Sequence, residues 1–66
     1  MGYEIIFKND DIINRVYASN KIQLNSLLYL LVKKQGIDLN DIQVSREELN
    51  GHLTILTNDE ILEEVK

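Results

Sequence analysis

The chain has 66 residues, with seven basic and eleven acidic side chains, a net charge of −4 and no cysteine. Its length predicts a single small domain, residues 1–66, and the lack of cysteine excludes disulfide bonds and thiolate metal sites. The acidic balance argues against direct binding of nucleic acid, because affinity for phosphates comes mainly from lysine and arginine.

The N-terminal stretch, MGYEIIFKNDD, places charged residues where a secretory signal needs an apolar run. The apolar run at residues 27–32 is far shorter than the ~20 residues that span a bilayer. We therefore expect a soluble, cytoplasmic protein with no membrane contact. Isoleucine, asparagine and lysine, which AT-rich codons encode, are frequent, so we also expect a gene from a low-GC bacterium or one of its phages or plasmids.

Two strands are predicted near the start of the chain. Residues 3–8, YEIIFK, and residues 12–18, IINRVYA, both alternate with a period of two and are rich in β-branched and aromatic side chains. The NDD sequence between them supplies turn residues that tolerate left-handed backbone. We expect the two strands to pair as an antiparallel hairpin.

Signals at both ends delimit a main helix over residues 20–35. A polar residue just ahead of it, Ser19 or Asn20, can accept hydrogen bonds from the free backbone N–H groups of the first turn. Gly36 ends the helix at a position where glycine adopts left-handed backbone at least cost. The two lysines of the last turn suit the negative end of the helix dipole.

Residues 45–51 allow two interpretations. A loop leads into a strand at about Ile42, and residues 52–57, HLTILT, alternate like a further strand. The Asn-Gly pair ahead of that segment is favoured in hairpin turns. Ser45 and Glu48, however, have capping-box spacing, so the same stretch could form one helical turn. We favour the hairpin.

A short C-terminal helix is predicted over residues 58–66. Thr57 and Glu60 have capping-box spacing, and the acidic residues of the first turn suit the positive end of the dipole. The chain is thus predicted to be a small two-layer α+β domain of order ββαββα, with an antiparallel sheet packed by the main helix and this short helix. The apolar stripe of the short helix consists of Ile61, Leu62 and Val65.

The main helix carries more apolar surface than a four-stranded sheet can easily cover. Leu30 falls on one flank and Val32 on the other, which widens the apolar arc to roughly 200°, and Tyr29 lies nearly opposite its centre. At ~100° per residue, the central face that would pack on the sheet holds Leu24, Leu27, Leu28 and Leu31.

Three kinds of neighbour could cover the flanks. The C-terminal helix could pack on Leu30 or Val32, a second copy could pack helix against helix as in twofold dimers, or another protein could dock there. We predict that this surface contributes to a homodimer or binds a protein partner. The predicted contact residues are Tyr29, Leu30, Val32 and Lys33.

No catalytic, metal or cofactor site is predicted. Nucleophilic catalysis needs a base beside the nucleophile, and three serines would have to share His52, the one histidine. The paired carboxylates fall in predicted turns or on an exposed helix, not in a cleft that would shift their pKa values apart. We therefore expect a non-enzymatic protein-interaction or regulatory protein without a cofactor.

The distribution of charge suggests an alternative function. Residues 37–66 hold eight acidic and two basic side chains, so this half could imitate nucleic acid and inhibit a nucleic-acid enzyme. Salt would weaken such binding steeply, whereas apolar docking would respond little. The residues that would stand in for phosphates are Asp38, Asp41, Glu47, Glu48, Asp59, Glu60, Glu63 and Glu64.

Overall fold

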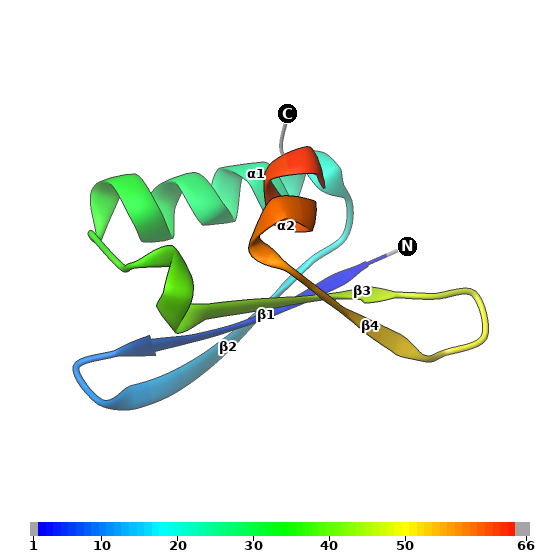
Figure 1. Ribbon diagram of the computed structural model, residues 1–66, viewed down its shortest axis with the longest axis horizontal. Coiled ribbons are helices and arrows are strands. Elements are labelled where there is room, and N and C mark those ends of the chain that lie inside the picture. Colours follow the sequence, from blue (N-terminus) through cyan, green and yellow to red (C-terminus); the bar gives the residue numbers. More distant parts are fainter. Residues whose placement is uncertain (1, 65–66) are drawn as a thin grey trace.

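The computed structural model describes residues 2–64, and the side chains of residues 2–61 (Figure 1). The predicted α+β class and ββαββα order are confirmed. The elements are β1 (Tyr3–Asn9), β2 (Ile12–Ala18), α1 (Lys21–Tyr29), the π-helical segment η1 (Leu30–Lys34), the 3-10 turn η2 (Leu39–Asp41), β3 (Ile42–Glu47), β4 (Leu53–Leu56) and α2 (Asn58–Glu64).

The four strands form one antiparallel sheet in the order β2-β1-β3-β4. β1 is therefore an interior strand, paired with its hairpin partner β2 on one side and with β3 on the other. Figure 1 shows α1 and α2 on the same side of the sheet. The domain thus has two layers, with an inner sheet face under the helices and an outer face that residues 2–64 leave uncovered.

The first hairpin turns in two residues, Asp10 and Asp11. Both have positive φ values, 51° and 65°, and the flanking residues Asn9 and Ile12 are paired. Positive φ at both central positions is the backbone of the hairpin turn whose twist matches that of the strands. The prediction that NDD supplies left-handed turn residues is confirmed.

The second hairpin decides between the two interpretations of residues 45–51. The N–H of Glu48 donates to the carbonyl of His52 at 2.8 Å, and the N–H of Gly51 donates to the carbonyl of Glu48 at 3.0 Å. Gly51 has φ of 84°, so it occupies the left-handed position of a three-residue hairpin loop. The hairpin prediction is confirmed, and the single helical turn was the wrong alternative.

The main helix begins where the capping signal predicts. The Oδ1 atom of Asn20 accepts a hydrogen bond from the N–H of Gln23 at 2.9 Å, which identifies Asn20 as the N-cap. The Oε1 atom of Gln23 in turn accepts from the N–H of Ser19 at 2.7 Å. The first bond satisfies a donor that the first helical turn leaves free, and the second ties the residue ahead of the cap to that turn.

The end of this helix differs from the uniform α-helix that the sequence predicts. From Leu30 the helix continues as π-helix, and the N–H of Gln35 donates to the carbonyl of Leu30 at 2.9 Å. Gly36, with φ of 70°, then reverses the chain, and the N–H of Ile37 donates to the carbonyl of Leu31 at 2.9 Å. The stop at Gly36 is confirmed, and the wider last turns are a feature that side-chain periodicity does not report.

The core lies between α1 and the inner sheet face. Ile5, Leu24 and Val44 are each 0% exposed, and Ile5 is paired directly with Val44 across β1 and β3. Burying a side chain of this size contributes roughly 1.5–3 kcal/mol. The other buried apolar residues are Tyr3, Phe7, Ala18, Leu28, Leu31, Ile37, Ile42, Leu56 and Ile61.

The short C-terminal helix starts with the predicted capping box. The N–H of Thr57 donates to the Oε1 atom of Glu60 at 3.1 Å, and the N–H of Glu60 donates to the Oγ1 atom of Thr57 at 3.2 Å. Ile61 is buried against the core. The rest of the predicted apolar stripe, Leu62 and Val65, lies outside the side chains that the structure describes.

Candidate protein-interaction surface

The apolar side chains of the main helix divide into a covered set and an exposed set. Leu24, Leu28 and Leu31 are buried, as predicted for the central face, and Leu27 and Val32 are partly buried against the same core. The exposed set lies on the side of the helix away from the sheet. It consists of Ile22, Tyr29 and Leu30, which are 79%, 54% and 46% exposed.

A groove of about 280 Å³ runs beside the helix where α1, η1, η2 and α2 meet. Tyr29, Val32 and Lys33 line it from the helix. Leu39 of η2 and Ile61 of α2 line it from the other side, and Asn25 and Leu28 complete the lining. The groove therefore brings together three of the four predicted contact residues. Val32 and Ile61 line the same groove, and Ile61 is the kind of neighbour that the C-terminal helix was expected to supply.

The fourth predicted contact residue, Leu30, lies outside this groove. It borders a shallow hollow on the solvent side of the helix, together with Asn25, Ser26 and Tyr29. Tyr29 lines both depressions. The exposed apolar surface is thus continuous from Leu30 across Tyr29 into the groove.

Basic side chains border this surface. The Nζ atom of Lys34 lies 5.9 Å from the centre of the Tyr29 ring, a cation–π distance that favours one position of the ring. Lys33 lines the groove itself. No acidic residue occurs between residues 21 and 34, so the helix surface is basic on a chain whose net charge is −4.

The structure groups four of the predicted acidic residues around one corner of the domain. The Nδ2 atom of Asn58 donates to the Oδ1 atom of Asn40 at 3.1 Å, which holds η2 beside the start of α2. The carboxylates of Asp38 and Glu60 are partly engaged in capping their own turns. The corner contains Asp38, Asp41, Asp59 and Glu60.

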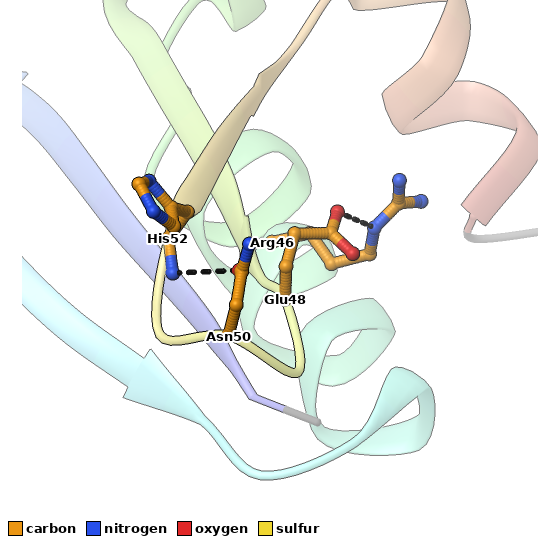
Figure 2. Close-up of polar contacts among 4 residues, drawn as sticks. All are labelled: Arg46, Glu48, Asn50 and His52. Atoms are coloured by element: carbon orange, nitrogen blue, oxygen red, sulfur yellow. Dashed lines mark hydrogen bonds and ion pairs between the residues drawn. The ribbon is translucent and has the colours of Figure 1, made fainter.

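Glu47 and Glu48 lie at the other end of β3, roughly 20 Å away along a strand of this length. Figure 2 shows the Nε atom of Arg46 on the Oε1 atom of Glu48, at 3.1 Å. A hydrogen bond from Thr54, together with that of Arg46, lowers the pKa of Glu48 below its ordinary value. The described acidic side chains therefore form no single surface, and those of Glu63 and Glu64 lie outside the description.

His52, which sequence analysis considered as a catalytic base, is an exposed residue of the second hairpin. Its backbone N–H donates to the Oδ1 atom of Asn50 at 3.2 Å, and its ring points away from the Arg46–Glu48 pair (Figure 2). Within residues 2–61, no group of three or more histidine, aspartate or glutamate side chains is arranged to hold a metal ion.

The outer sheet face is an apolar surface that sequence analysis did not single out. Ile13 and Tyr17 project from β2, and Leu53 and Ile55 from β4, all more than half exposed. The alternation of residues 12–18 places Ile13 and Tyr17 on one face. Nothing in that pattern tells which face the helices cover.

Comparison with known proteins found no matching family model, no similar curated protein and no similar solved structure. Of the helices in the described part of the chain, none is long and apolar enough to cross a membrane.

Proposed function

We propose that this protein acts by binding another protein through the groove between α1 and α2 and the exposed helix surface beside it. One observation carries the proposal: an apolar groove lined by Tyr29 stays open beside the main helix, and Tyr29 and the adjacent Leu30 are about half exposed. Exposed apolar patches with polar borders mark interaction sites more often than they mark chance exposure. Tyrosine is also among the residues that contribute most at protein interfaces.

The groove favours a partner of particular chemistry. At about 280 Å³ it lies at the lower limit of small-molecule sites, and it suits one bulky apolar side chain better than a whole substrate. Lys33 and Lys34 would favour an acidic residue next to that side chain on the partner. The proposed role is therefore that of a non-enzymatic binding or regulatory protein.

Capture experiments test this function. Tagged wild-type protein is incubated with a cytoplasmic extract of a low-GC bacterium, the origin and location that the sequence predicts, and is washed at low and then at high salt. We expect a protein that stays bound at high salt, because apolar contacts are screened little by ions.

Matched variants link the capture to the groove. Tyr29→Ala and Lys33→Glu should lose the partner, whereas Leu49→Ala should retain it. Leu49 is a suitable control because it is the most exposed large apolar residue among the described side chains, at 96%, and lies on the second hairpin loop. Equal capture by wild type and Tyr29→Ala would contradict the proposed site.

The acidic-mimic function is a second candidate, favoured by the corner that contains Asp38, Asp41, Asp59 and Glu60. It has less support, because Glu47 and Glu48 lie at a distance and Glu48 is paired with Arg46. A nucleic-acid enzyme that elutes as the salt rises, and that Asp41→Asn with Asp59→Asn fails to capture, would support the mimic over the groove.

A further inference from the structure

The two edges of the sheet are protected to different degrees. β4 has four residues, and α2 begins only two positions after it. β2 has seven residues and pairs with β1 one to one along its whole length, without a bulge. Its sequence, IINRVYA, contains no lysine, proline or glycine, the residues that usually discourage pairing at an edge strand.

The first hairpin determines which backbone groups of β2 are free. Asn9 and Ile12 flank a two-residue loop, so they exchange both of their backbone hydrogen bonds. The residues of β2 whose backbone groups hydrogen-bond to β1 are then Ile12 and every second residue after it. The N–H and C=O groups that point out from the sheet therefore belong to Ile13, Arg15 and Tyr17.

We propose that β2 pairs with the β2 strand of a second copy, antiparallel about a twofold axis at Arg15. The two sheets would become one eight-stranded sheet with every helix on the same side. This register uses all three outward-pointing residues and places Ile13 of each copy opposite Tyr17 of the other. Pairs of an aromatic and a β-branched residue are favourable in antiparallel strands. Ile13 and Tyr17 are 65% and 67% exposed in the single chain, so the dimer would bury part of both side chains.

The charges on this edge are compatible with a second copy. Two Arg15 side chains would meet at the axis, and like charges that face each other are destabilising. The Nε atom of Arg15, however, lies 3.7 Å from the Oε2 atom of Glu4 on β1, whose side chain is only 16% exposed. Each copy thus brings an arginine together with its own counter-charge, so each of the two arginines that meet at the axis is partly neutralised by the glutamate behind it.

This dimer goes beyond the proposed function, since it uses β2 and leaves the contact residues of the groove unused. It would hold two copies of the groove in one particle, so a partner with two binding segments would gain avidity. Failure of one proposal leaves the other intact, because the variants that test them lie on different elements.

Single cysteines test the register, because the chain has none of its own. In a hydrogen-bonded antiparallel pair, directly opposed Cα atoms are ~5.5 Å apart, within the range that a disulfide spans. Arg15→Cys, oxidised with diamide, should form a covalent dimer. Ile55→Cys, at an equally exposed position of the same sheet face on the other edge, should stay monomeric.

Sedimentation equilibrium tests the assembly itself. We expect the wild type to dimerise and Ile13→Lys to raise the dimer Kd by at least about tenfold while its circular dichroism spectrum is unchanged. If Ile13→Lys does not fold, Tyr17→Lys serves the same purpose. A wild type that stays monomeric at about 0.5 mM would overturn the proposal, as would a dimer that Ile55→Cys traps and Arg15→Cys does not.

Discussion

The two sides of the main helix carry similar side chains in opposite environments. Leu24 and Leu28 are buried against the sheet, at 0% and 6% exposure, whereas Leu30 and Tyr29 face solvent at 46% and 54%. The buried side needs no explanation beyond folding, because the sheet covers it. The exposed side makes no comparable contribution to the fold, and it is the side for which we propose a role in binding.

The comparison shows that apolar composition alone does not decide whether a residue belongs to the core. Leu28 and Leu30 are two positions apart, and neighbours at that spacing do not share a helix face. What separates them is the position of the sheet and of α2. The predictions below begin on the buried side of the helix, continue to its C-terminal end and to the second hairpin, and finish on the exposed side.

The largest expected effect comes from the buried side. Leu28→Ala removes a side chain that is 6% exposed and leaves a cavity, so it should lower the free energy of unfolding by roughly 2–5 kcal/mol. Urea unfolding followed by circular dichroism measures the loss. A loss as small as that of an exposed leucine would mean that the helix is not packed on the sheet as described.

A smaller effect is expected where the helix ends. Gly36 has φ of 70°, so Gly36→Ala should cost about 1–2 kcal/mol through backbone strain alone, since an added Cβ would meet no atom within 4 Å. Gly36→Asn should cost less, because asparagine tolerates left-handed backbone. The difference in the free energy of unfolding between Gly36→Ala and Gly36→Asn, measured by urea unfolding, reports the backbone strain separately from any packing effect.

A smaller effect again is expected away from the helix, at Glu48. Its pKa is lowered in the folded state, so its contribution to stability is present above its ordinary value of about 4.5 and is lost as the pH falls through the lower, folded value. The difference in Tm between the wild type and Glu48→Gln should therefore shrink as the pH drops below about 4.5. A difference that grows in acid would contradict the pairing with Arg46 and Thr54.

Local signals were enough to predict much of the fold. The order of elements, both hairpins, a polar cap at Ser19 or Asn20, the stop at Gly36 and the Thr57–Glu60 capping box all depend on residues close together in the chain. Periodicity also predicted the buried leucines, because it reports which side of a helix is apolar.

What the sequence could not predict depends on contacts between distant elements. The groove needs Leu39 and Ile61 beside Val32, and these residues come from three separate elements. The outer sheet face is defined by the strand order, in which β1 lies between β2 and β3, and by the position of both helices on one side of the sheet (Figure 1). The π-helical turns at Leu30–Lys34 follow from backbone bonding that no side-chain pattern records.

The free energy of unfolding of Leu30→Lys, measured beside that of Leu28→Ala, tests the central claim most directly. If the exposed side of the helix serves binding and not folding, Leu30→Lys should unfold within about 0.5 kcal/mol of the wild type, since a lysine stem can lie on the apolar surface with its charge in water. A loss comparable to that of Leu28→Ala would show that Leu30 belongs to the core, and would contradict the interaction surface proposed for this helix.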